Sequence, residues 1–334
     1  MDWTNLLTAW YRQNARDLPW RRTKDAYAIW VSEVMLQQTR VAAVVPYYER
    51  FLSELPDAIA LAKVDDDRLH KLWEGLGYYS RAKNLKRAAA IVAETYGGKL
   101  PESYESLLKL PGIGEYTAGA IASIAFGEPV PSVDGNVLRV YARLFAVERD
   151  VRDLAFRKQV RFALLPLMPK DAPGLFNAAL MELGATVCVP NGAPACEACP
   201  IKAHCEAYKQ KRTGELPLVS KKRARRIVHK TVFVLRQNGK PLGCRGPDTG
   251  LLAGLWRLPE AEGTLGDKQA AAWLGERNLR PLGELHFYER KHIFTHIEWH
   301  MRVCAADIAA EELPKGWVPL GESHALPTAY KICL

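Results

Sequence analysis

The chain has 334 residues, of which 48% are hydrophobic and 25% charged, with a formal net charge of +9 and a pI near 9.1. This length suffices for two domains, the composition excludes a disordered chain, and the basic balance favours a polyanionic partner such as nucleic acid. The N-terminus lacks a signal-peptide pattern and no apolar run could span a bilayer, so we expect a cytoplasmic protein, nucleoid-associated if bacterial.

Residues 1 to about 210 show helical spacing of apolar side chains, and convincing strand patterns are absent there. The connections carry Pro or Gly, as in Leu55–Asp57 and at Gly97 and Gly98. The sequence predicts helices over residues 25–38, 65–76, 81–96, 103–110, 115–125, 136–146, 153–165 and 175–184.

The pattern changes in the last third of the chain. Residues 214–228 form a predicted basic linker, which is either a solvated tether or a tether along DNA phosphates. After His229 the apolar period becomes two, which predicts strands over 231–236 and 293–303, with a short helix over 269–274. We therefore expect an α+β second domain.

A glycine-rich segment, Leu110–Gly119, predicts a helix, a tight hairpin at Gly112–Gly114 and a second helix from about Glu115. Glycines allow the sharp turn and leave N–H groups uncovered at a helix N-terminus, which can bind a phosphate. Farther along, Asp134 precedes a predicted helix and could simply be its N-cap. Backbone N–H groups would keep such a carboxylate ionised, as stabilisation of a developing cation also requires.

Glu33 lies on a predicted helix with a mostly apolar face. Burial on that face would raise its pKa, so that it could act as a general acid near neutral pH. Periodicity alone favours the alternative, a surface glutamate at the boundary of that face. In the segment Gly75–Arg81, Tyr78 and Tyr79 suit stacking on bases, and we expect one of the two to belong to the core.

Four of the seven cysteines lie within eighteen residues, and without an export signal they indicate metal ligation rather than disulfides. The spacing contains a single C-x2-C unit, whereas structural zinc sites pair two such units or add histidines. A [4Fe-4S] cluster, whose four irons each need one thiolate, fits better, and zinc is the alternative. The four residues are Cys188, Cys196, Cys199 and Cys205.

Taken in this order, the motifs resemble those of the helix-hairpin-helix DNA glycosylase superfamily with an iron–sulfur cluster, and most closely the MutY-type adenine DNA glycosylases. The resemblance covers nearly the whole chain. Besides the cysteines it rests on segments 18–21, 30–39, 75–79, 110–114 and 133–136, and in the second domain on 250–256 and 294–296.

The resemblance implies an all-α helix-hairpin-helix glycosylase domain with an iron–sulfur cluster loop, followed by an α+β MutT/Nudix-like domain. We expect the first domain over residues 1–213, with a six-helix barrel over about 25–132 and a cluster part formed by the N-terminal segment with 133–213. The linker over 214–228 would lead to a lesion-recognition domain over 229–334. One [4Fe-4S] cluster and a monomer acting on double-stranded DNA are implied.

The implied reaction removes adenine mispaired with 8-oxoguanine or guanine, after the target nucleotide has left the base stack. By resemblance, Glu33 protonates the adenine and Asp134 stabilises the sugar cation, while Tyr116 and Asn136 line the site. Related endonucleases use a lysine at the position of Tyr116 to form a Schiff base, so a phenol there implies a monofunctional enzyme that leaves an abasic site. The implied DNA and substrate contacts are Leu18, Trp20, Arg21, Leu36, Gln38, Thr39, Tyr78, Gly112, Gly114, Thr295 and His296.

The sequence departs from the family pattern at three places. The first cysteine gap has seven residues instead of six, Thr295 replaces a serine, and Ala178 replaces a longer polar residue. Two alternative functions stay open. One is a thymine-mismatch or pyrimidine-lesion glycosylase on the same scaffold, and the other is a redox-sensing DNA-binding protein that would need neither Glu33 nor Asp134.

Overall fold

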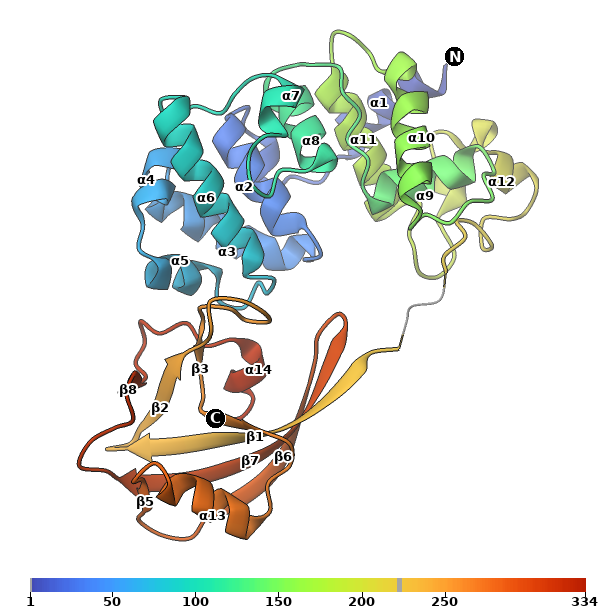
Figure 1. Cartoon of the computed structure of the whole chain (residues 1–334). Helices are drawn as coiled ribbons and strands as arrows, with labels where there is room; N and C mark the ends of the chain where they lie inside the picture. Colours follow the sequence, from blue (N-terminus) through green and yellow to red (C-terminus); the bar gives the residue numbers. More distant parts are fainter. Residues whose placement is uncertain (1, 221–223) are drawn as a thin grey trace. The chain divides into compact units, whose positions relative to one another are not determined.

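The computed structural model describes residues 2–220 and 224–334 (Figure 1). The chain divides into two compact units, Met1–Val64 with Ser80–Lys221, and Asp65–Tyr79 with Lys222–Leu334. The first unit is helical and the second is built around a β-sheet. Within the described ranges, no helix is both long and apolar enough to cross a membrane.

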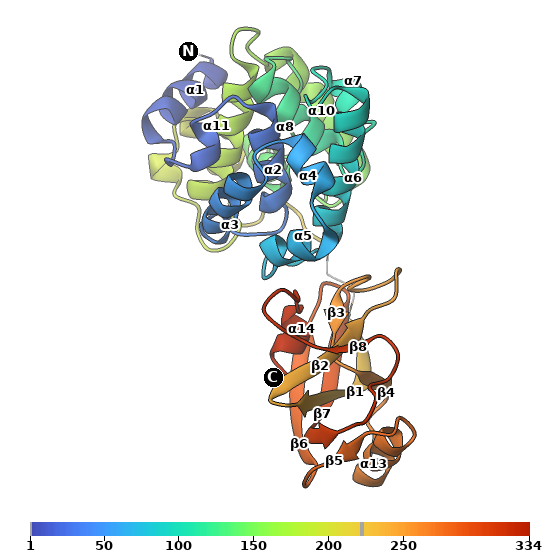
Figure 2. The ribbon, with the colours of Figure 1, turned by 90° about the vertical axis from the view of Figure 1, so that its left-hand side faces the viewer.

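Helices joined by short connections make up the first unit (Figure 2). They are α1 (Trp3–Asn14), α2 (Ala26–Leu36), α3 (Val41–Glu54), α4 (Ala58–Lys63), α6 (Ser80–Thr95), α7 (Tyr104–Leu107), α8 (Glu115–Ala125), α9 (Gly135–Leu144), α10 (Leu154–Leu164), α11 (Pro173–Thr186) and α12 (Glu206–Lys209), with single 3-10 turns η1 (Pro19–Arg21), η2 (Leu165–Leu167), η3 (Cys196–Ala198) and η4 (Lys202–His204).

Side-chain caps explain where several of the predicted helices begin. Asp25 accepts a hydrogen bond from the backbone of Tyr27, and Asp153 accepts one from the backbone of Ala155. The helix predicted over 103–110 is shorter, because α7 spans only Tyr104–Leu107 after its N-cap Ser103. Sequence patterns missed α1, α3 and α4, and α3 even contains Pro46, a residue that normally interrupts a helix.

One hydrophobic core of the first unit joins the N-terminal helix to segments more than a hundred residues away. Leu7 of α1 packs with Leu138 of α9, Phe156 of α10 and Phe176 of α11, all of them buried. Burying a side chain of this size contributes about 1.5–3 kcal/mol relative to leaving it in water. The first helix is thereby fixed against the part of the chain that contains Asp134.

The first residues of the predicted linker attach to the helical unit. Leu216 is buried, and its carbonyl accepts a hydrogen bond from Arg143 Nε at 2.7 Å. The carbonyl of Leu218 accepts one from the backbone N–H of Val151 at 3.1 Å. At the other end of the predicted linker, Arg226 already begins strand β1. Residues 221–223 of the basic run lie outside the described residues.

The second unit contains a mixed sheet with the order β3-β2-β1-β7-β5, in which the central strands β1 and β7 run parallel. The predicted α+β architecture is confirmed. Its elements are α5 (Asp66–Trp73), β1 (Arg226–Gln237), β2 (Lys240–Arg245), β3 (Trp256–Arg257), β4 (Glu260–Glu262), α13 (Asp267–Gly275), β5 (Arg280–Pro281), β6 (His286–Ile293), β7 (Ile297–Ala309), β8 (Trp317–Pro319) and α14 (Thr328–Lys331).

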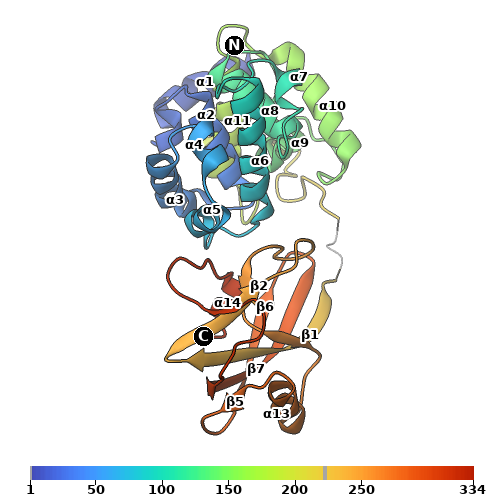
Figure 3. The same cartoon turned by 60° about the vertical axis from the view of Figure 1, so that its left-hand side comes forward.

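Each face of this sheet is covered by a helix (Figure 3). Val232 and Val234 of β1 face the side where Tyr330 of α14 packs, whereas Phe233 and Leu235 face the side where Leu274 of α13 packs. Side chains of a strand alternate between its faces, so β1 can be apolar throughout its centre and still bury every side chain.

The strand predicted over 293–303 is confirmed from Ile297 onward, but its continuation back to Ile293 is wrong. Strand β6 ends at Ile293 and β7 begins at Ile297, and the two pair antiparallel across a short turn. The backbone N–H of Phe294 donates to the carbonyl of Ile297 at 2.8 Å, which closes that turn. Both strands of a hairpin alternate with a period of two, so a short turn between them left the pattern undisturbed.

Candidate active site

A cavity of about 710 Å³ in the helical unit brings the predicted catalytic residues together. Glu33 comes from α2, Tyr116 from the first turn of α8, and Asp134 and Asn136 from the start of α9. The predicted adenine-contacting residues line the same wall. They are Leu18, Trp20, Arg21 and Leu36, and Thr39 lies beside them.

Glu33 is buried, with only 5% of its surface exposed. Helix α2 is covered on all sides, because every residue from Tyr27 to Met35 is buried. The alternative of a surface glutamate is therefore wrong. The hydroxyl of Tyr116 donates a hydrogen bond to Glu33 Oε2 and also lies 3.6 Å from Met181 Sδ.

Burial raises the pKa of Glu33 to about 7. The hydrogen bond from Tyr116 and the positive charge of Arg21 act in the opposite direction, while the neighbouring charge of Asp134 raises the pKa further. A carboxyl group that titrates near neutral pH is partly protonated under working conditions, so it can donate a proton to a reacting atom.

Asp134 is the N-cap of α9. Its Oδ1 accepts a hydrogen bond from the backbone of Val137 at 2.8 Å, and its Oδ2 accepts one from Asn136 Nδ2 at 2.7 Å. The capping interpretation is confirmed, but the cap does not by itself control ionisation. Burial raises the pKa of this carboxyl group despite the two hydrogen bonds. The carboxylate is therefore poorly solvated, which strengthens its interaction with a nearby cation.

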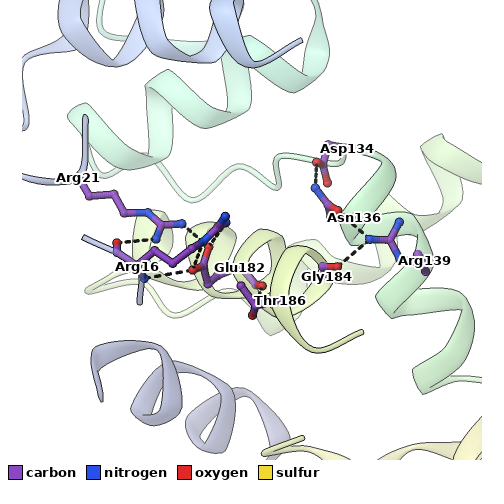
Figure 4. A network of polar contacts seen from close by, with 8 residues as sticks. All are labelled: Arg16, Arg21, Asp134, Asn136, Arg139, Glu182, Gly184 and Thr186. Carbon is purple, nitrogen blue, oxygen red and sulfur yellow. Dashed lines mark hydrogen bonds and ion pairs between the residues drawn. The ribbon is translucent and has the colours of Figure 1, made fainter. Parts of the chain in front are cut away.

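Arg139, which sequence patterns did not single out, fixes Asn136, which in turn hydrogen-bonds to the Asp134 carboxylate (Figure 4). Its Nη2 donates to Asn136 Oδ1 and to the carbonyl of Gly184, and its Nε donates to the carbonyl of Cys188, each at 2.7 Å. A Cβ at position 184 would lie 2.6 Å from Asn136 Cβ, so the close approach of α9 and α11 requires this glycine.

Glu182 on α11 is a further charged group of the cavity wall, and its side chain is completely buried. Arg16 donates to its carboxylate from Nε and Nη2, each at 2.7 Å, and Arg21 Nη2 donates to it at 2.6 Å (Figure 4). Burial acts to raise the pKa of Glu182, but the hydrogen bonds from the two guanidinium groups outweigh it and hold the pKa at about 2. The signal that could have found Glu182 is its helical spacing, one turn beyond Ala178.

Comparisons with known proteins identify the family. The family model described as HhH-GPD superfamily base excision DNA repair protein matches residues 31–164, and a NUDIX domain model matches residues 231–334. The chain is 36% identical to the adenine DNA glycosylase of Mus musculus, an alignment that covers 95% of this chain and 72% of the relative. It is 34% identical to that of Homo sapiens, over 97% and 72%. The chain belongs to the adenine DNA glycosylase family.

Solved structures agree with this assignment. A thermostable thymine-DNA glycosylase is 29% identical with a TM-score of 0.56, covering 62% of this chain and 95% of that one. A non-covalent endonuclease III–DNA complex has a TM-score of 0.54 at 24% identity, over 62% and 94%, and shows the shared fold. The predicted helix-hairpin-helix glycosylase fold with a Nudix-like second domain is confirmed.

The four cysteines of this family member are free thiols, and Cys188, Cys199 and Cys205 pack against the core that contains α9. Arg143 connects two of them, since its Nη1 lies 3.3 Å from Cys188 Sγ and its carbonyl accepts from Cys205 Sγ at 3.4 Å. Burial, together with the charges of the other three thiolates, raises the pKa of Cys199 to about 12. In the described part of the chain, no three Cys, His, Asp or Glu side chains converge on one metal ion.

The predicted hairpin has the backbone that its glycines suggested. Gly112 has φ +78°, and a Cβ there would lie 2.7 Å from Asn84 Cβ. Gly114 is the N-cap of α8 and has open space where a side chain would be. The N-terminus of α8 is therefore free to receive an anion such as a DNA phosphate.

We expect Gly112→Ala to weaken binding to duplex DNA about tenfold, a loss on the order of 1.4 kcal/mol. A side chain at this position meets both an unfavourable positive φ and the contact with Asn84, so the hairpin must shift. Fluorescence anisotropy at several salt concentrations measures the effect, with Gly114→Ala as the control in open space. Equal affinities for Gly112→Ala and the unchanged protein would contradict it.

The end of α2 carries two of the predicted lesion contacts. Gln38 is exposed with φ +59°, and the following Thr39 accepts a hydrogen bond from Arg81 Nη2 at 3.2 Å. Arg81 is buried, and its Nη1 also donates to the carbonyls of Val34, Met35 and Gln37 at 2.7–2.9 Å. Arg81 thus caps the C-terminus of α2.

Three further predicted contacts lie in the second unit. Tyr78 is 44% exposed with φ +48°, whereas Tyr79 is buried, so Tyr79 is the expected core residue of the pair. The hydroxyl of Tyr78 lies 2.9 Å from Thr295 Oγ1. Thr295 and His296 are both exposed in the turn between β6 and β7.

Proposed function

We propose that this protein is a monofunctional base-excision glycosylase that hydrolyses the N-glycosidic bond of adenine paired with 8-oxoguanine or guanine in duplex DNA. The observation that carries the proposal is the pairing of Glu33 with Asp134 in one cavity of about 710 Å³, a volume that accommodates a nucleobase. Membership of the adenine DNA glycosylase family supports adenine as the base.

In the proposed reaction, the target nucleotide rotates out of the duplex and its base enters the cavity that Leu18 and Trp20 help to line. Protonated Glu33 donates its proton to a ring nitrogen of adenine, which makes the base a better leaving group. The bond to C1′ then breaks, and the electron pair leaves with the base. Ionised Asp134 stabilises the sugar cation until water adds to C1′ and gives a proton to the Glu33 carboxylate, which restores the acid.

Tyr116 decides what happens after base release. Its phenol hydrogen-bonds to Glu33 and cannot form a Schiff base with the sugar, unlike the amine of a lysine. The product is therefore an abasic site in an intact strand. Asn136 orients Asp134 through its 2.7 Å hydrogen bond, and Arg139 fixes Asn136 in turn.

We propose that Cys188, Cys196, Cys199 and Cys205 hold one [4Fe-4S] cluster. The observations fit, because the four thiols are unpaired in disulfides and Arg143 contacts both Cys188 and Cys205. Each thiolate of a cubane cluster binds a different iron, whereas one zinc ion needs all its ligands around one centre. When bound, the cluster supplies a rigid link within the segment that Arg139 and Arg143 connect to α9.

We propose that residues of each unit take part in lesion recognition. In the second unit, exposed Tyr78 would stack on a base and Thr295 and His296 would hydrogen-bond to one. In the helical unit, Gln38 and Thr39 at the end of α2 are the proposed lesion contacts. The net charge of +9 supports binding to double-stranded DNA. We further propose that the enzyme acts as a monomer in the cytoplasm, on the nucleoid if the source is bacterial.

A thymine-mismatch glycosylase is the second candidate, because the thermostable thymine-DNA glycosylase shares this fold at 29% identity. Single-turnover base release from duplexes with A opposite 8-oxoguanine, A opposite guanine, and T opposite guanine separates the two. We expect adenine release from the first two and none from the third, with no covalent complex after borohydride treatment. Thymine release would favour the second candidate, and no release from any duplex would exclude both.

A further inference from the structure

The charged cluster formed by Glu182, Arg16 and Arg21 is the part of the cavity wall that the proposed reaction leaves unused. Arg21 forms part of the wall and acts electrostatically on Glu33. It is fixed at two points, because Nη2 donates to Glu182 at 2.6 Å and Nη1 donates to the carbonyl of Arg16 at 2.9 Å. The guanidinium groups of Arg16 and Arg21 are therefore both bound to the Glu182 carboxylate.

Burial makes the charge of Glu182 important. An unpaired buried charge is costly, so the carboxylate and the two guanidinium groups depend on one another. Without Glu182, two positive charges would remain beside the cavity and would favour ionised Glu33, which has no proton to donate. Glu182 is on α11 and Glu33 on α2, so the coupling passes through Arg21 of η1.

We propose that Glu182 is a positioning residue: it holds Arg21 at the cavity wall and balances the arginine charges, so that Glu33 keeps its proton near neutral pH. The groups facing Glu33 are Tyr116 from α8, Asp134 before α9, and Arg21 from η1. Tyr11 of α1 lies beside the arginine pair, and Lys24 and Asp171 also line the cavity. The consequence for catalysis rests on the proposed function, whereas the effect on Glu33 does not.

The test measures the protonation of Glu33 directly, by NMR titration of protein labelled with ¹³C in glutamate carboxyl groups. A Glu33→Gln variant identifies the signal. We expect Glu182→Gln, which keeps a hydrogen-bond acceptor but removes the charge, to lower the titration midpoint of Glu33 by about one pH unit. Glu182→Asp, which keeps the charge, should restore the midpoint of the unchanged protein. Asp171→Asn is the matched control, since it removes a negative charge from the same cavity without removing the partner of Arg16 and Arg21.

The same variants are then compared in single-turnover adenine release between pH 5 and 9. In Glu182→Gln the rate should begin to fall at a lower pH than in the unchanged protein. The rates of the two proteins should agree within about twofold at the acidic end, and the variant should be about tenfold slower above the midpoint. An unchanged midpoint with a uniformly lower rate would show a purely structural role and overturn the proposal, as would an equal shift in Asp171→Asn.

If Glu182→Gln does not fold, Arg16→Gln decides, because Arg16 is 37% exposed and its loss leaves Glu182 paired with Arg21. Removal of a positive charge should raise the midpoint of Glu33, and an unchanged or lower midpoint would overturn the proposal. Absence of adenine release by the unchanged protein would contradict the proposed function alone, since the NMR midpoints are measured without substrate.

Discussion

Glu33→Gln should lower the single-turnover rate of adenine release by at least about a hundredfold and up to ten-thousandfold, the range over which a general acid contributes. Glutamine has nearly the same shape and can still contact Tyr116, so the cavity should persist. It carries no acidic proton, however, and the adenine would have to leave as an anion. Quench-flow or manual sampling of duplexes with A opposite 8-oxoguanine measures the rate.

Binding of the same duplex by Glu33→Gln should stay within about twofold of the unchanged protein, a difference of less than 0.5 kcal/mol. Glu102→Gln, at an exposed position of the same unit, is the control for the loss of a negative charge. Base release at an unchanged rate in Glu33→Gln would assign the proton to another group. It would also agree with the alternative of a DNA-binding protein that needs no catalytic carboxyl group.

The same substitution should stabilise the protein at alkaline pH. Burial raises the pKa of Glu33 from 4.5 to about 7, so the folded state retains a proton that the unfolded state has lost. The contribution of this group to stability is present below pH 4.5 and is lost as the pH rises to about 7. Urea unfolding gives the difference in the free energy of unfolding between Glu33→Gln and the unchanged protein. This difference should favour the variant by on the order of 3 kcal/mol more at pH 8 than at pH 4.5. A difference that does not depend on pH would contradict this pKa.

Loss of a cluster ligand is the second large effect that we expect. Cys199→Ser should lose its iron and about 4 kcal/mol or more of stability, since metal binding and folding are coupled in such segments. Cys199 borders the core that α9 shares with α11, so the disturbance reaches the support of Asp134. Iron and sulfide analysis, visible absorption and thermal unfolding measure the change, with Cys244→Ser in the other unit as the control. Zinc in the purified protein, or an unchanged iron content in Cys199→Ser, would contradict the cluster assignment.

Sequence patterns were most successful where the chemistry is local. The bounds of α8 follow from its hairpin and apolar spacing, and the cap at Asp134 follows from one side chain. They could not establish the burial of Glu33, because α2 is enclosed on every side and its surroundings come from other helices. They also missed Glu182 and its ion pair with Arg21, since the two residues meet across 161 residues of chain.

Sequence motifs identified the residues of the site itself. The residues that hold them in place could be recognised only from the three-dimensional packing. Arg139 and Arg81 are ordinary basic residues in the sequence, and the sequence gives no reason to prefer them over other arginines. Their importance depends on carbonyl groups of distant segments, such as those of Cys188 and Val34. A basic residue acquires such partners only when the helices around it have packed.

The attachment of Leu216 to Arg143 determines where the helical unit can be cut from the chain. Arg143 uses one guanidinium group to contact Cys188 Sγ, the carbonyl of Val189 and the carbonyl of Leu216. A fragment that stops at residue 213 would remove one of these acceptors and expose a surface that Leu216 covers. The C-terminal boundary of the helical unit should therefore be placed at residue 220, where the backbone of Ser220 still donates to Asp150.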